Sequence, residues 1–317
     1  MRLIVRPTMR PRWSGTRDAF RPPPPVRPPA VAGAFYPADP GELDALVDAL
    51  LAEAAEWPSQ AGESTSPPAG PVAGVLVPHA GLVYSGVVAA VGWLAAAQAA
   101  PTTVVLLGTN HGAAWLDGIG AWDTGAWRMP TGSAIVDERL AAAIVELGPP
   151  FTVDRAAHAG EHSIEVQLPF LGRVLPAARI VPLAVGTGAG GRAIGAGRRL
   201  GALLGRRRAA GDAIVLAISS DMAHYPSEGA CARATRAQLP SIERIDPEGL
   251  ARAEREVVAA GVPSLVCGMC GIAPAVVGLA ALGAMGATRG TALAAATSAD
   301  AGGPPDRTVG YLSVAFR

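Results

Sequence analysis

The sequence predicts an α/β protein, with a single three-layer αβα domain around a central sheet that is mostly parallel or mixed. Two observations indicate this class. Short apolar runs alternate along the chain with longer runs of helical character. The apolar runs are also continuous, which is typical of strands buried on both faces of a sheet. With 317 residues, half of them hydrophobic, the chain is long enough to bury a substantial core.

The predicted elements follow one another in a regular order. Six segments have the composition of buried strands: residues 73–78, 102–108, 178–186, 212–220, 290–298 and 309–316. Six segments have helical patterns: residues 41–54, 86–99, 137–147, 190–208, 247–260 and 272–286. The sequence shows no internal repeat and no clear change in composition after residue 71, so we expect one domain over residues 29–317.

Two segments have the composition of irregular chain rather than of packed elements. Residues 1–28 are rich in Arg and Pro and contain too little apolar surface to fold, so we expect a disordered arm there. Residues 57–71, with the sequence WPSQAGESTSPPAGP, combine Gly, Pro and Ser and are expected to form a surface loop.

Composition argues against several classes of protein. The net charge is zero, so nothing indicates a nucleic-acid partner or binding to a membrane surface. The uncharged stretch 264–287 contains Pro274 and much Gly and Ala, and we expect a loop and a buried helix there rather than a membrane span. The amino-terminal residues lack the apolar region of a signal peptide. Three cysteines are too few for a disulfide framework, so we expect a cytoplasmic protein with free thiols.

Polar residues directly follow three of the predicted strands. His79 follows the apolar run GVLVP, and His111 follows VVLLG. Asp221 and His224 follow IVLAISS. In open α/β sheets, binding sites form beyond the carboxyl ends of the strands. If these strands are parallel neighbours, the four side chains converge on one crevice.

Two further residues stand at predicted helix starts. His162 lies in EHSIEVQLPFL, and Cys270 directly precedes an apolar helix. The partial positive charge of a helix N-terminus favours a thiolate, which is a nucleophile or a metal ligand. The alternatives are a small buried apolar residue for the cysteine and a structural residue, satisfied by hydrogen bonds, for the histidine.

Together these motifs resemble the Memo family, in particular the bacterial and archaeal proteins called AmmeMemoRadiSam system protein B. The matching stretches occur in the family's order and span about residues 27 to 317. They are RPPAVAGAFYPADPGEL (27–43), VPHAGLVYSG (77–86), LLGTNHG (106–112), EHSIEVQLPFL (161–171), SSDMAHY (219–225) and CGIAP (270–274).

The resemblance implies an extradiol-dioxygenase-like fold, that of α/β proteins with a non-haem iron site. Class III extradiol dioxygenases hold iron with two His and one Glu, and Memo-like proteins have a Cys in place of the Glu. Carried over to this chain, the metal ligands are His79, His111 and Cys270. Cys267 competes for the third position, and the Gly-x-x-Pro register that follows Cys270 favours Cys270.

The resemblance also implies catalytic residues and a metal. Asp221 and His224 match a second pair of site residues in the family, and His162 matches a further histidine near the cleft. We expect these three residues to be catalytic, with His224 exchanging protons near neutral pH. Two histidines and one anionic ligand favour Fe(II), and copper or zinc are the alternatives because a thiolate is softer than a carboxylate.

These residues support three functional hypotheses. The first is a metal-dependent redox enzyme that acts on a small molecule or peptide together with a radical SAM protein and an AMMECR-type protein, the partners that the resemblance implies. The second is a non-catalytic protein that binds a peptide or another ligand in the former catalytic cleft. The third is a zinc-dependent hydrolase with Asp221 or Glu161 as its base.

Overall fold

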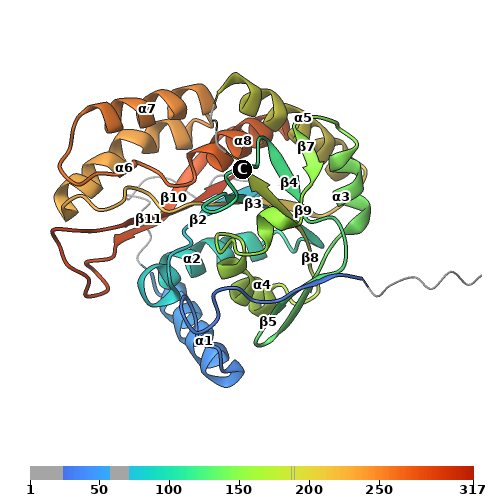
Figure 1. Ribbon diagram of the computed structural model, residues 1–317, viewed down its shortest axis with the longest axis horizontal. Helices are drawn as coiled ribbons and strands as arrows, with labels where there is room; N and C mark the ends of the chain where they lie inside the picture. The colour runs from blue at the N-terminus through green and yellow to red at the C-terminus, as the bar shows by residue number, and fades with distance from the viewer. Residues whose placement is uncertain (1–23, 58–70, 187, 189) are drawn as a thin grey trace, which may run out of the picture.

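A computed structural model describes residues 24–57, 71–186, 188 and 190–317. It has three layers, with a central sheet between two layers of helices (Figure 1). The predicted α/β class, with a mixed sheet, is confirmed. The first 23 residues of the predicted arm and residues 58–70 of the predicted surface loop lie outside the described residues.

The central sheet has eight strands in the order β10-β11-β2-β9-β3-β8-β4-β7. The middle strands β2, β9, β3 and β8 run parallel, whereas β11 is antiparallel to β10 and β2, and β4 is antiparallel to β8. Every residue of these four middle strands is buried except Arg179, which explains their continuous apolar sequences. The strands are β2 (Gly74–Val77), β3 (Thr103–Thr109), β4 (Ile119–Ala121), β7 (Phe151–Val153), β8 (Arg179–Val185), β9 (Ile214–Ser219), β10 (Gly290–Thr297) and β11 (Gly310–Phe316).

The helices cover both faces of this sheet. α2 packs against β2 and β11 on one face, beside α1 and α4, and α8 packs against β3 and β9 on the other face, beside α5 and α7 (Figure 1). The helices are α1 (Pro40–Ala55), α2 (Leu82–Ala97), α3 (Glu138–Val145), α4 (Leu168–Val174), α5 (Gly191–Ala209), α6 (Glu228–Glu243), α7 (Pro247–Ala259) and α8 (Ile272–Ala284), with short 3-10 turns η1 (Ala156–His158) and η2 (Glu165–Gln167).

All six helices predicted from the sequence are present; α4 follows the helix start expected near His162, and α6 is an additional helix. It contains Pro240, and Arg233, Arg236 and other polar residues interrupt its apolar positions, so its sequence lacks a clear helical pattern. The uncharged stretch 264–287 forms a loop and then the buried helix α8, as predicted. Among the helices of the described residues, none combines the length and the apolar character that crossing a membrane requires.

A second, three-stranded sheet begins before the predicted domain boundary. It has the order β1-β5-β6, formed by Val26–Arg27, Ala126–Met129 and Gly132–Ile135. Val26 and Arg27 fall within the predicted arm, but they pair with β5 in this sheet. The reason is Arg27, which is 1% exposed and lies over the Trp127 ring.

Arg27 forms a buried ion pair. Its Nη1 lies 2.6 Å from Glu165 Oε2, and its Nε and Nη2 donate to the carbonyl oxygens of His158 and Glu161 at 2.7 and 2.6 Å. Glu165 is fully buried and also accepts the hydroxyl of Tyr36 at 2.5 Å. The amino-terminal segment is therefore tied to the loop that carries Glu161 and His162.

The substitution Arg27→Ala is expected to lower the free energy of unfolding by about 3 kcal/mol, because Glu165 would lose its cation while remaining buried. Urea unfolding measures this loss. Arg173→Ala is the matched control, since Arg173 and Asp48 form an exposed pair whose removal should change stability little. Equal losses in the two variants would contradict this account of the buried pair.

Candidate metal centre

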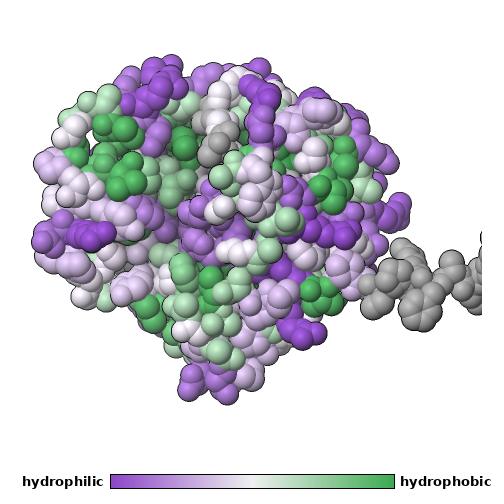
Figure 2. All heavy atoms as spheres, viewed as in Figure 1, coloured by the Kyte–Doolittle hydropathy of each residue, from purple (hydrophilic) through white to green (hydrophobic). Residues whose placement is uncertain are grey.

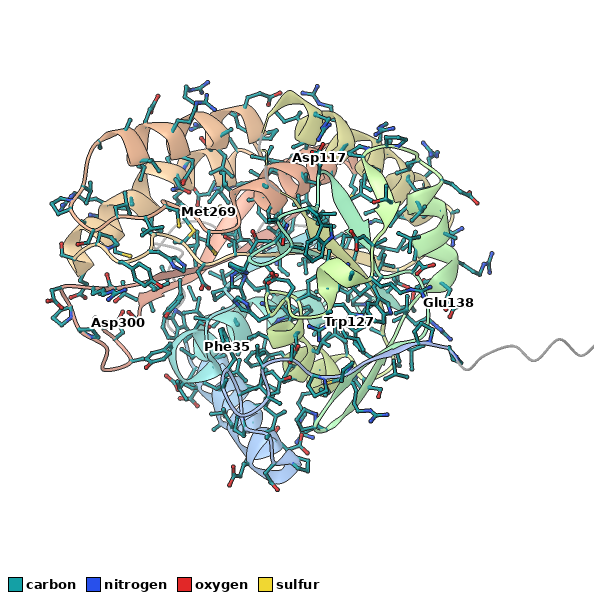
Figure 3. All side chains as sticks on the ribbon, in the orientation of Figure 1. Phe35, Asp117, Trp127, Glu138, Met269 and Asp300 are labelled. Atoms are coloured by element: carbon teal, nitrogen blue, oxygen red, sulfur yellow. The ribbon has the colours of Figure 1, made fainter. Side chains whose placement is uncertain are left out.

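The predicted site residues come together at the carboxyl edge of the parallel strands. His79 follows β2, His111 follows β3, and Asp221 follows β9, while Cys270 precedes α8. Figure 3 labels Phe35, which lies on the side of α2, and Met269, the sequence neighbour of Cys270, which lies on the side of α8. The sheet thus brings together residues that lie almost 200 positions apart in sequence.

A cavity of about 490 Å³ opens at this edge. The middle of the face shown in Figure 2 is coloured as hydrophilic, with apolar patches around it. Four of the five histidines line the cavity, together with Asp221 and several aromatic side chains. Its main lining residues are Phe35, His79, Tyr84, His111, His162, Asp221, His224, Tyr225, Ser298, Pro304, Val309 and Tyr311.

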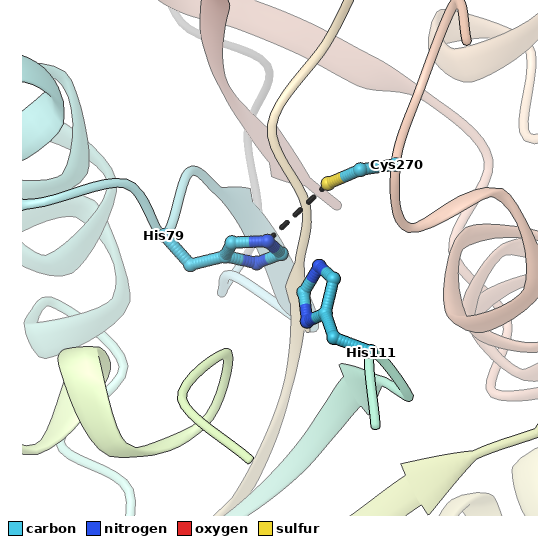
Figure 4. Close-up of side chains that lie close together, drawn as sticks. All are labelled: His79, His111 and Cys270. Atoms are coloured by element: carbon cyan, nitrogen blue, oxygen red, sulfur yellow. Dashed lines mark hydrogen bonds between the residues drawn. The ribbon is translucent and has the colours of Figure 1, made fainter. Parts of the chain in front are cut away.

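His79, His111 and Cys270 lie close together (Figure 4). The Sγ atom of Cys270 lies 3.2 Å from Nε2 of His79, and the two imidazole rings meet edge to face with their centroids 5.4 Å apart. One donor atom from each of the three residues can be chosen so that all lie within 4.8 Å of one another. The three predicted ligands therefore form one cluster.

Glu161 holds His111 at two points. Its Oε2 accepts the backbone N–H of His111 at 2.7 Å, and its Oε1 lies 2.9 Å from Nδ1 of the ring. Burial raises the pKa of Glu161, but its hydrogen bonds with His111 outweigh this effect and hold the pKa well below its usual range. The resulting carboxylate accepts a hydrogen bond from the Nδ1–H of His111, so Nε2 of His111 is left free for a metal.

Gly108 allows the segment that carries Glu161 to approach β3 closely. A Cβ atom at this position would lie 2.5 Å from Cγ1 of Ile164 and 2.6 Å from Oγ of Ser163. A larger residue would therefore push the 161–165 segment away from His111. This close contact explains why the apolar run VVLL is followed by a glycine at position 108.

Asp221 holds the loop of His79. Its Oδ1 accepts the backbone N–H groups of His79 and Ala80 at 2.7 and 3.2 Å, while its Oδ2 lies 3.8 Å from Nε2 of His224. Burial raises the pKa of Asp221, but the neighbouring His79 and His224 outweigh this effect and lower it. Asp221 thus positions the backbone around one predicted ligand and faces the cavity through its other oxygen.

The two other predicted catalytic residues, His162 and His224, lie beside different members of the cluster. His162 stacks on His111, with ring centroids 4.3 Å apart and planes inclined by 21°. Burial lowers the pKa of His162, and the nearby His111 lowers it further. Nε2 of His224 is buried and has no hydrogen-bond partner among the described residues.

The chemistry of the three clustered donors fits a transition metal. Burial lowers the pKa of His79 to about 4, so its ring is neutral near pH 7 and offers a lone pair. Burial also raises the pKa of Cys270 well above its usual range, and a coordinated cation is what deprotonates such a thiol. Two imidazoles and one sulfur are donors that iron, copper and zinc accept.

Two further groups of donors share residues with this cluster. They are His111 with Glu161 and His162, and Asp221 with His224 and Cys270. Cys267 belongs to none of the groups found among the described residues, and burial raises its pKa to about 12. This arrangement favours Cys270 over Cys267 as a ligand, in agreement with the sequence register.

The fifth histidine, His158, lies apart from the site. It is fully buried beside Trp122 and Trp127, and its Nε2 lies 2.9 Å from the carbonyl oxygen of Gly120. It therefore has the structural role that a single histidine usually has.

Several residues around the cluster were not predicted as site residues. Ser219 lies 3.0 Å from Nδ1 of His79, and Ser220 lies 3.9 Å from Sγ of Cys270; both belong to the SSDMAHY stretch, but nothing in that stretch shows which residues they contact. Ser298, in the loop before β11, and Tyr311, in β11, also line the cavity. These contacts depend on how distant elements pack, which no local motif encodes.

The stability of the metal-free protein is expected to fall as the pH falls from 6.5 toward 4. Burial lowers the pKa of His79 and of His158 to about 4, against 6.5 for the ordinary side chain. In this window the unfolded chain binds protons that the folded protein does not, so stabilisation is complete above pH 6.5 and is lost on acidification. Each residue accounts for up to about 3 kcal/mol.

Urea unfolding at successive pH values measures this dependence. The variant His158→Gln keeps a donor for the Gly120 carbonyl and should make the profile less steep. A profile that is flat across this window would contradict the predicted pKa shifts.

The substitution Glu161→Gln is expected to weaken binding of Zn²⁺ by about 10- to 100-fold, because the amide no longer fixes the His111 ring as a carboxylate does. Titration of the metal-free protein with Zn²⁺ measures the change. Glu248→Gln is the control, since Glu248 forms an exposed pair with Arg198. Unchanged affinity in Glu161→Gln would remove Glu161 from the metal centre.

Comparison with known proteins agrees with the motifs. The Memo-like protein family matches residues 27–315. A MEMO1 family protein from Methanopyrus kandleri is 35% identical over 306 residues, covering 92% of this chain and 99% of the relative. Another from Ignicoccus hospitalis is 36% identical over 307 residues, covering 92% and 98%.

One solved structure, of an uncharacterized protein from Escherichia coli, aligns with a TM-score of 0.49 at 18% identity. It covers 77% of this chain and 99% of that protein. The family match over residues 27–315 spans the positions of every motif quoted above. The resemblance found in the motifs is confirmed, and this chain belongs to the Memo family.

Proposed function

We propose that this protein binds a metal through His79, His111 and Cys270 and uses it in a redox reaction on a small molecule held in the cavity. The observation that carries the proposal is the convergence of three donors at the edge of a cavity of about 490 Å³. Glu161 and Asp221 hold the loops of the two histidines, so the donors are positioned before a metal arrives.

Fe(II) is the first metal to test. Two histidines and one anionic ligand on one side of an ion leave positions for oxygen and substrate, which is the pattern of non-haem iron oxygenases. The sulfur of Cys270 also suits copper and zinc, so these are the alternatives. When bound, a redox metal would supply the electron transfer that the side chains alone do not provide.

The protein's own residues would bind the substrate and move protons. His224 lines the cavity with an Nε2 that forms no hydrogen bond among the described residues and lies 3.8 Å from Asp221 Oδ2, so it is the first choice for proton exchange with a substrate. His162 stacks on His111 and forms another part of the wall, where it would orient the substrate. Asp221 would keep His224 and the His79 loop in place.

The cavity wall favours a substrate with an apolar body and little negative charge. Four aromatic side chains line it, and the described lining contains neither Lys nor Arg. A phosphate-bearing peptide would require such cations, so the lining does not favour the peptide-binding alternative. For a zinc hydrolase, both candidate bases are already engaged, Glu161 with His111 and Asp221 with the His79 loop.

Partners and location are part of the same proposal. The likeness to AmmeMemoRadiSam system protein B supports joint action with a radical SAM protein and an AMMECR-type protein. The three cysteines are free thiols, which supports a location in the reducing cytoplasm.

Elemental analysis of protein purified without oxygen tests the metal site. We expect near-stoichiometric iron or copper in the parent protein and a large loss of metal in His79→Ala, His111→Ala and Cys270→Ala. Cys267→Ala is the matched control and should retain its metal. Full occupancy in His111→Ala would remove that residue from the site, and zinc as the bound metal would favour the hydrolase.

A protein that stays empty after incubation with iron, copper and zinc would contradict the proposal as a whole.

If the protein does bind a metal, oxygen consumption by the loaded protein separates redox chemistry from hydrolysis, because only redox chemistry requires oxygen. Cys270 oxidation in air is a second sign of redox chemistry at this centre.

A further inference from the structure

The two histidines of the cluster have different partners at Nδ1. His111 faces the carboxylate of Glu161, which can only accept a hydrogen bond. His79 faces the hydroxyl of Ser219, whose Oγ lies 3.0 Å from Nδ1. A hydroxyl either donates or accepts, so its orientation decides which nitrogen of His79 carries the proton and whether Nε2 offers a lone pair.

A chain of buried side chains sets the orientation of Ser219. Nε1 of Trp93 is only a donor, and it lies 2.8 Å from Oε1 of Gln167. The other end of the Gln167 amide is therefore its nitrogen, which donates to the Pro78 carbonyl at 2.8 Å and to Ser219 Oγ at 3.0 Å. Trp93, Gln167 and Ser219 are all fully buried, so solvent does not compete for these bonds.

The hydrogen of the Ser219 hydroxyl points to another acceptor. Its Oγ donates to the carbonyl oxygen of Ser163 at 2.6 Å. If this hydrogen turned toward His79 instead, the two oxygen atoms would face each other at that distance without a hydrogen between them, and a buried acceptor would lose its partner. One lone pair of Ser219 faces Gln167, and the remaining one faces His79.

We propose that Ser219, oriented by Gln167 and Ser163, is a positioning residue that holds His79 as the tautomer protonated at Nδ1, with a lone pair on Nε2. The contact of 3.2 Å between Cys270 Sγ and this Nε2 fits a thiol that donates to the lone pair. Only the consequence for metal binding rests on the proposed function, because the tautomer is a property of the metal-free chain.

Nuclear magnetic resonance of the full-length, metal-free protein with ¹⁵N-labelled histidine tests this proposal. His79→Gln identifies the signals of His79 by their loss. We expect a protonated Nδ1 and an unprotonated Nε2 in the parent protein. In Ser219→Ala, the populations should shift toward the tautomer protonated at Nε2, which neutral histidine favours in water.

Two variants serve as controls for this shift. Ser219→Thr keeps the hydroxyl and should preserve the parent pattern of His79. Ser313→Ala removes another fully buried serine, whose hydroxyl donates to the Val88 carbonyl at 2.5 Å, and should leave the His79 signals unchanged. Any general effect of losing a buried hydroxyl would appear in Ser313→Ala as well.

A parent protein with His79 protonated at Nε2 would overturn the proposal, and so would a Ser219→Ala protein with unchanged His79 signals. The parent spectrum decides the first point even if the variant does not fold. Titration with Zn²⁺ follows the consequence: affinity should fall by about tenfold in Ser219→Ala and stay constant in Ser313→Ala. Equal affinity in both variants would overturn the link between this tautomer and metal binding.

A parent protein that shows the expected tautomer but binds no Zn²⁺ supports the proposal for Ser219 and counts against the proposed metal centre. The two claims therefore fail in distinguishable ways.

Discussion

Parallel pairing between β2, β9 and β3 is the constraint on which the candidate site depends. Val77 pairs with Ser219, and Leu107 pairs with Ile218, so the three strands end at one edge of the sheet. His79, His111 and Asp221 each stand two positions beyond the last residue of their strand. The sheet, rather than any local motif, thus sets the distance between these side chains, and α8 brings Cys270 to the same edge.

Buried polar partners then hold each loop in place. Glu161 and Asp221 bind the backbone N–H groups of the loops that carry the histidines, while Arg27 binds the carbonyl oxygens of His158 and Glu161. Unpaired polar groups are costly in a protein interior, so these bonds permit few alternative arrangements. A cluster organised in this way would lose little conformational freedom on binding a metal.

The sequence predicted the layers and the strand ends because both are local patterns. Continuous apolar runs define the buried strands, and the polar residues after them mark the crevice. It did not predict β1, because Val26 pairs with Ala126 across a hundred residues and neither segment is strongly apolar. Nor did it predict α6 or the role of Ser219, since the first lacks a clear helical pattern and the second depends on register. The assignment of Cys270 over Cys267 needed the family resemblance, which the arrangement of the cluster now supports.

Anomalous diffraction from crystals of the protein loaded with iron in the absence of oxygen would test the central claim most directly. The account predicts one strong peak within about 2.5 Å of His79 Nε2, His111 Nε2 and Cys270 Sγ. Such a peak would establish these three side chains as ligands and would show which positions around the metal remain open. A peak that lies elsewhere, or the absence of any peak in loaded crystals, would contradict the assignment of this cluster as the metal centre.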